Sequence, residues 1–140
     1  MNAGTILAAL AGVAIAAQVV VNTLGIRSLG MGALIGVSGL ATAAAGFAVA
    51  LLSRPEFTVR SVLYGFSSGV IGAFILAAIV LAAGRAGLAQ TLSLVVASQL
   101  IAGLLIDRTG VFGSAAADLG PVQVLGVALV LVGGLMVVRG

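Results

Sequence analysis

The sequence predicts an all-α membrane protein with five transmembrane helices in a single domain over residues 1–140. Hydrophobic residues make up 62% of the chain and charged residues only 6%. Soluble domains carry about 25% charged residues, so these few charges are too sparse to cover a water-facing surface. The hydrophobic residues also fall into stretches of about 20, the length that a helix needs to cross a bilayer. The lipid bilayer is therefore the expected partner of most of the surface.

The first two spans are predicted at residues 4–24 and 31–52. The segment between them is rich in glycine and carries Arg27. The second span is followed by Arg54 and Pro55. Proline cannot continue a helix interior, so this second end is clearly marked.

The other three spans are predicted at residues 62–83, 88–106 and 121–138. A break between the first two of these, at Gly84 to Gly87, is required, because a merged helix of more than 40 residues would far exceed the bilayer. The last span begins at Pro121, a residue suited to the first helical position. A loop of small residues, 111–120, precedes it.

The composition excludes several kinds of site. The chain has no cysteine and no histidine, so disulfides, thiolate metal sites and histidine-based sites are ruled out. We expect no metal and no cofactor. The arginines are dispersed singly rather than clustered, so no nucleic-acid partner is expected. An enzyme is not expected either, because the chain lacks the side chains of a nucleophile–base pair.

The arginines divide equally between the two faces of a five-span protein. The predicted connections place one set on one face and the other set opposite: Arg54, Arg60 and Arg108 against Arg27, Arg85 and Arg139. There is no lysine to break the tie. An excess of Lys and Arg on the cytoplasmic side normally sets orientation, so copies of this chain are expected to insert both ways up. Two inverted copies would then form an antiparallel homodimer of ten helices.

Few polar side chains lie in the predicted spans, and three of them are amides: Gln18, Asn22 and Gln99. An amide has four hydrogen-bonding capacities and cannot satisfy them on its own helix turn. Two interpretations stay open. The amides bond between helices, or they line a cavity that binds a polar substrate, together with Ser98, which neighbours Gln99.

Hydroxyl groups and the one carboxylate near a span have simpler explanations. Ser38, Thr42 and Ser67 are expected to bond to a carbonyl of the preceding turn. Asp107 closes the fourth predicted span. It is either an interfacial carboxylate in water or a proton-linked or gating group.

Two sequence patterns resemble a known family. Gln18 and Asn22 are followed by Gly25, and Ser98-Gln99-Leu100 leads to Asp107-Arg108-Thr109-Gly110. This arrangement resembles the YdcZ-type family of small bacterial inner-membrane proteins, in the drug/metabolite transporter superfamily, over nearly the whole chain. The chain departs from many relatives in having no tryptophan and a shorter, less aromatic second-to-third loop.

The resemblance implies five spans, a location in the bacterial inner membrane, and export of a small molecule by two inverted copies. Its motif positions in this chain are Gln18, Asn22, Gln99 and Asp107. We expect a transporter that exports a polar or amphipathic metabolite by alternating access, with Asp107 as the one obvious carrier of any coupled proton. The alternatives are a passive dual-topology channel for ions or small solutes, and a non-transporting partner subunit of a paralogue.

Overall fold

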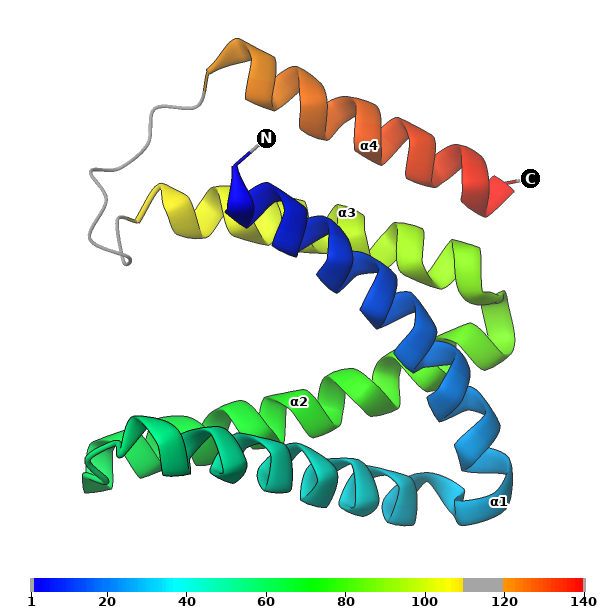
Figure 1. The fold of residues 1–140 in the computed structure, drawn as a ribbon. Coiled ribbons are helices and arrows are strands. Elements are labelled where there is room, and N and C mark those ends of the chain that lie inside the picture. Colours follow the sequence, from blue (N-terminus) through cyan, green and yellow to red (C-terminus); the bar gives the residue numbers. More distant parts are fainter. Residues whose placement is uncertain (1, 110–119, 140) are drawn as a thin grey trace. The chain divides into compact units, whose positions relative to one another are not determined.

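The computed structural model describes residues 2–109 and 120–139, and these form helices and no strand. There are four helices in chain order: α1 (Ala3–Ser53), α2 (Val59–Ala86), α3 (Leu88–Asp107) and α4 (Pro121–Arg139) (Figure 1). The loop predicted at 111–120 lies outside the described residues except for Gly120. The chain forms two units, residues 1–85 and 86–140.

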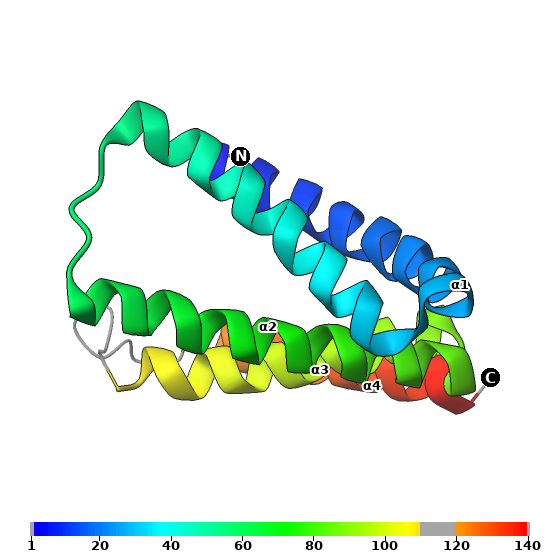
Figure 2. The same ribbon diagram turned by 90° about the horizontal axis from the view of Figure 1, so that it is seen from below.

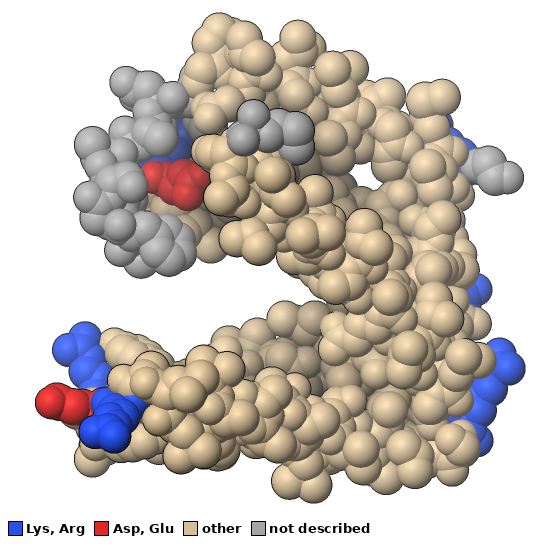
Figure 3. Space-filling view, viewed as in Figure 1, with Lys and Arg blue, Asp and Glu red and all other residues tan. Residues whose placement is uncertain are grey.

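Each of the four helices is long and apolar enough to cross a membrane, so the predicted all-α membrane class is confirmed. The arginines lie at helix ends or, in the case of Arg27, three residues before a break in α1, and all of them are exposed. Figure 3 shows the same distribution, with charged side chains at the ends of helices and uncharged surface along them. The uncharged, apolar stretches between these ends are suited to the hydrocarbon core of a bilayer.

Helix α1 contains 51 residues and would be about 77 Å long if it were straight. The hydrocarbon core of a bilayer is only about 30 Å thick. The helix is not straight, because Gly30 has φ 74° and ψ 164°. That backbone conformation is open essentially to glycine alone, and Figure 1 shows two arms of α1 diverging from this point.

Side chains confirm that the two arms of α1 fold back on each other near the bend. A methyl group added at Gly25 would lie 3.0 Å from Cδ1 of Leu34. In a straight helix these two residues would be separated by about 13.5 Å along the axis. Leu34 is 6% exposed, and Val19 and Asn22, on the turns before Gly25, are 4% and 6% exposed. The described part of α1 is therefore packed at the bend and exposed toward the ends of its arms.

The connection from α1 to α2 is set by local hydrogen bonds. Arg54 adopts the left-handed conformation, and its N–H donates to the Ala50 carbonyl at 2.9 Å. Pro55 follows, as is common after a helix C-cap. At the start of α2, the Thr58 N–H donates to Ser61 Oγ at 3.0 Å, and the Ser61 N–H donates to Thr58 Oγ1 at 3.1 Å. This reciprocal capping box fixes where α2 begins.

Arg60 and Tyr64 form an interfacial pair on the first turns of α2. Arg60 Nε donates to the Tyr64 hydroxyl at 3.0 Å, and its guanidinium carbon lies 5.6 Å from the ring centre. Tyrosine and arginine are typical residues of the membrane–water boundary.

In the second unit, α3 and α4 pack side by side (Figures 1 and 2). Their approach is close at Gly134, where an added methyl group would lie 3.6 Å from the Ser93 carbonyl oxygen. Gln90 Nε2 donates to the Val138 carbonyl at 2.8 Å. That carbonyl lies in the last turn of α4, where the helix itself offers no donor, so Gln90 ties the end of α4 to the start of α3.

Gly30→Ala is expected to destabilise the protein by about 1–3 kcal/mol, because alanine is strained at this φ and ψ. Thermal unfolding of the protein in lipid nanodiscs measures the loss. Gly36→Ala is the control, since a methyl group there meets nothing within 4 Å. Equal stability of the two variants would contradict the assigned bend.

Gln90→Leu is expected to destabilise the packing of α4 on α3 by about 0.6 kcal/mol, the average for a hydrogen bond between membrane helices. The same unfolding measurement reports this change. Gln99→Leu serves as the comparison, because Gln99 is exposed on the same helix. If both substitutions changed stability equally, the bond to Val138 would have no special role.

Candidate functional site

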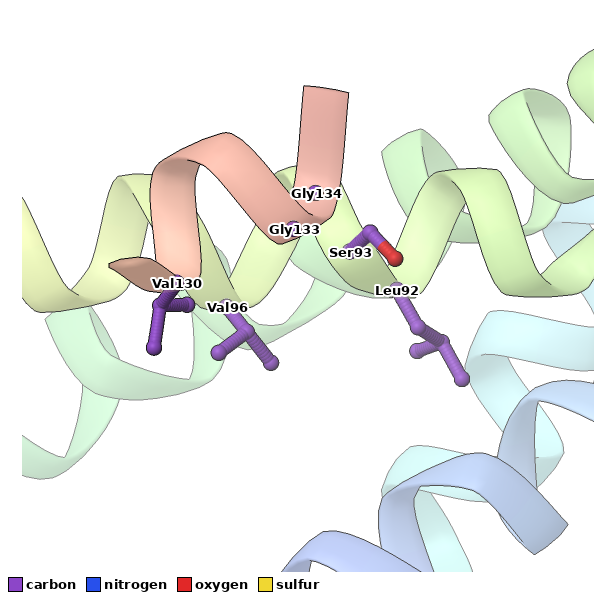
Figure 4. A pocket seen from close by; sticks show the side chains of 6 residues that line it. All are labelled: Leu92, Ser93, Val96, Val130, Gly133 and Gly134. Atoms are coloured by element: carbon purple, nitrogen blue, oxygen red, sulfur yellow. The ribbon is translucent and has the colours of Figure 1, made fainter. Parts of the chain in front are cut away.

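The second unit contains an open groove between α3 and α4 with a volume of about 310 Å³. Six residues line it: Leu92, Ser93 and Val96 from α3, and Val130, Gly133 and Gly134 from α4. Figure 4 shows the side chains of Leu92, Val96 and Val130 pointing the same way. Because the two glycines have no side chains, the wall on the α4 side stays low, and a mainly apolar hollow results.

Hydroxyl residues of the spans are of two kinds, and Ser93 belongs with Ser38 and Ser67, whose predicted bonds to the preceding turn are absent among the described residues. Thr42, Thr91 and Ser98 donate to carbonyls of the preceding turn, at 2.9, 2.8 and 2.9 Å. The Ser93 hydroxyl makes no such bond within the described residues, and in Figure 4 it points toward the side of the groove where Leu92 lies. It is therefore available to a molecule in the groove.

Gln99 and Ser98, both predicted site residues, are exposed on α3. Gln99 follows Leu92 by seven residues and Val96 by three, so helical spacing places it on the face that carries the outer wall of the groove. Its amide makes no hydrogen bond to the other described residues, whereas the Ser98 hydroxyl donates to the Val95 carbonyl. Of the pair, Gln99 is the residue with free hydrogen-bonding capacity.

Gln18 and Asn22 belong to the first unit and differ from each other in burial. Asn22 lies in the packed part of α1 and is 6% exposed, whereas Gln18, one turn earlier, is exposed. Spacing puts them on one helix face, and Val19, which directly follows Gln18, is buried at 4% exposure. Neither amide makes a hydrogen bond to another described residue, so bonding between helices and binding of a substrate both stay predictions for Gln18 and Asn22.

Asp107 is the last residue of α3 and is exposed. The next residue, Arg108, lines a second, smaller depression of about 160 Å³ with three apolar residues of the same helix: Ile101, Leu104 and Leu105. Asp107 does not line it. Its place at the end of α3 is compatible with an interfacial carboxylate and with a gating group, and both stay predictions.

Gln90 was not among the residues that the sequence singled out. Its amide near the start of a span is the same signal that pointed to Gln18, Asn22 and Gln99. The groove residues Leu92, Val130 and Gly133 carried no signal, because their types are common along the whole chain. Only the packing of α3 on α4 shows what they form.

Comparison with known proteins supports the resemblance seen in the sequence. Residues 3–136 match the model of a family described as "Putative inner membrane exporter, YdcZ". No curated protein matches the chain, and no solved structure does. The match covers nearly the whole chain and agrees with its long apolar helices. The chain therefore belongs to the YdcZ family of membrane transporters, as a multi-pass protein of the inner membrane.

Proposed function

We propose that this chain exports a small polar or amphipathic molecule as an antiparallel homodimer that works by alternating access. The observation that carries the proposal is the pair of exposed amides, Gln18 and Gln99, on otherwise apolar helices. Polar groups inside a membrane are costly and normally face a bundle interior or a wet cavity. Among the described residues of one chain these amides have no hydrogen-bond partner, and a second copy or a substrate supplies one.

Five crossings per chain follow if α1 crosses twice. Its length exceeds the bilayer more than twofold, and Gly30 is the point where it reverses. An odd number of crossings puts the chain ends on opposite faces. The arginines then divide three against three, and neither orientation is favoured.

An inverted pair of identical chains supports alternating access for a reason of symmetry. Each conformation of the pair has a counterpart, related to it by the two-fold symmetry, in which the two chains have exchanged roles. The inward-open and outward-open states are therefore equal in intrinsic free energy, so a modest difference in binding shifts the balance between them. The junctions at Gly30 and Gly87, each with positive φ, would allow stiff helical arms to tilt against one another.

Lysines added on one face should lock the orientation and abolish export by that variant alone. The double substitution Glu56→Lys and Phe57→Lys acts on the α1–α2 connection. The double substitution Ser28→Lys and Ala86→Lys acts beside the bend of α1 and at the C-terminal end of α2. Each variant alone should export nothing, and co-expression of the two should restore export. Extrusion of a panel of metabolites and dyes from cells measures the effect, and full export by one locked variant alone would refute the inverted pair.

Gln99→Leu should lower export at least about tenfold without loss of protein, because it removes an amide that the substrate needs. Ser98→Ala is the matched control, since the Ser98 hydroxyl is already bonded to its own helix. Export and counterflow are measured in proteoliposomes. Loss of the folded protein in Gln99→Leu would mean that Gln99 holds helices together, and flux without counterflow in the unmodified protein would indicate a channel.

A further inference from the structure

We infer that Gln99 of one copy and Gln99 of an inverted second copy lie together at the two-fold axis, and that both amides bind one uncharged substrate molecule. The inference rests on the proposed export function and deepens it, because the site is complete only in the pair. Three properties of Gln99 support it: its depth in α3, the side of α3 on which it lies, and its unpaired amide.

The length of α3 fixes the depth of Gln99 in the membrane. The helix contains 20 residues and is therefore about 30 Å long, which equals the thickness of the hydrocarbon core. It has no charged residue before Asp107 at its end, so the helix can lie within the core. Its midpoint falls between Ala97 and Ser98, and Gln99 lies about 2 Å beyond it along the axis. The amide is thus close to the centre of the bilayer.

Gln99 lies on the side of α3 that faces away from α4. The side of α3 that meets α4 is marked by the bond from Gln90 to Val138 and by the close approach of Gly134 to Ser93. Around the helix axis, Gln99 is about 180° from Gln90 and about 120° from Ser93. It is exposed, and α4 does not supply a partner for its amide.

Nothing else at the centre of the bilayer satisfies this amide. A glutamine side chain cannot satisfy its four hydrogen-bonding capacities on its own helix turn, and Gln99 makes no hydrogen bond to the other described residues. Lipid tails offer neither donors nor acceptors. The boundary of the hydrocarbon core is about 15 Å away, which is beyond the reach of the side chain. A partner in another molecule is therefore required.

An inverted copy brings a second amide to the same depth. The two-fold axis of such a pair lies in the membrane plane, so it carries each group to the equal height on the other side of the centre. The two Gln99 residues then differ in height by only about 4 to 5 Å, within the length of one small molecule. Leu92, on the same face of α3, would differ from its own counterpart by about 16 Å. Only a residue near the centre can meet its own copy.

The two amides decide the class of ligand. Each amide donates and accepts hydrogen bonds and carries no charge. The middle of α3 carries no charged side chain, and an unpaired charge costs far more to bury in an apolar medium than a polar group does. The ligand is therefore an uncharged molecule with both a donor and an acceptor, such as a primary amide, a urea or an alcohol.

Cysteine cross-linking of the full-length protein in membranes tests the pair, because the chain has no cysteine of its own. With an oxidant, Gln99→Cys should form a disulfide-linked dimer. Leu92 and Gly103 lie on the same face, equally far from the midpoint of α3 on opposite sides of it. Leu92→Cys and Gly103→Cys should therefore each fail to link to themselves and should link to each other when co-expressed. Gly103 accepts a side chain, since an added methyl group meets nothing within 4 Å.

A parallel pair would give a different pattern of cross-links. Each position would then meet its own copy, so Leu92→Cys and Gly103→Cys would each form a dimer alone. That result would refute the inverted pair and the proposed mechanism of export with it. Absence of both the Gln99→Cys dimer and the mixed dimer would overturn the contact at Gln99 alone, provided that co-expression of the two lysine-locked variants still restores export.

Thiol protection in nanodiscs tests the ligand. Val96→Cys places a thiol one turn from Gln99, and Leu94→Cys is the matched control, on another face of α3 and exposed to a similar extent. Pentanamide is the neutral probe, and pentanoate and pentylammonium are charged probes of similar size. Pentanamide is expected to slow labelling of Val96→Cys alone by a membrane-permeant maleimide, and the charged probes to slow neither thiol. Equal slowing at both thiols, or slowing by a charged probe, would overturn the assigned ligand class.

Substitution in one copy shows whether the two amides share a ligand. Val96→Cys is placed in one lysine-locked variant and Gln99→Leu in the other, and the two are co-expressed. Loss of one hydrogen bond should weaken the protection by pentanamide about fivefold. Unchanged protection would mean that each copy holds its own ligand, and it would overturn the shared site.

Export and binding fail separately in this design. No protection in the pair that keeps both Gln99 residues would mean that the amides bond only to each other, and the ligand assignment would fall. Protection itself requires no transport. Protection without counterflow in proteoliposomes would leave the shared site in place and overturn the proposed export function.

Discussion

The constraint on which the structure depends is that lipid offers no hydrogen bonds to the backbone. Every peptide group in the hydrocarbon core must be satisfied within the chain, so the chain crosses as helices. Turns are confined to places where the chain supplies its own solution. One is the capped connection between Ser53 and Val59, with its reciprocal Thr58 and Ser61 bonds. Two more among the described residues are Gly30, where α1 bends, and Gly87, the N-cap residue of α3, and both have positive φ.

The same constraint applies to side chains and separates structural polar residues from candidate functional ones. Thr42, Thr91 and Ser98 return their hydroxyls to their own helix. Gln90 reaches the exposed carbonyl end of a neighbouring helix. Polar groups that remain without a partner in the described chain are stable only if something else binds them. We propose that the inverted second copy and the substrate supply the hydrogen-bond partners of those groups.

Much of the fold could be predicted from residues that strongly favour the start or the end of a helix. Pro55 and Pro121 marked where a helix ends and begins, and the glycines around Arg85 marked a required break. The first helix was predicted to stop at residue 24, but α1 stays helical up to the single bend at Gly30. A segment with isolated glycines has no reason to unwind where water does not compete for its hydrogen bonds.

The site was less predictable, because it depends on which helices pair. Gln99 and Asp107 stood out by their residue type in an apolar chain. The residues that line the groove did not stand out, because valines and glycines occur throughout the chain. Only the close approach of α4 to α3 at Gly134 determines which of them line it. The amide type of Gln90 was a signal in the sequence, but its partner was not, because the Val138 carbonyl lies 48 residues away.

The most direct test of the inverted pair is to measure, in living cells, which way the chain with its natural charges is oriented in the membrane. Ser28→Cys places a single thiol just before the second arm of α1, and Phe57→Cys places one in the connection that follows this arm. An impermeant maleimide labels the thiols that face outward. Our account predicts that each is labelled in about half of the molecules, with the two fractions adding to the whole. Complete labelling of one thiol and none of the other would show a single orientation and contradict the inverted pair.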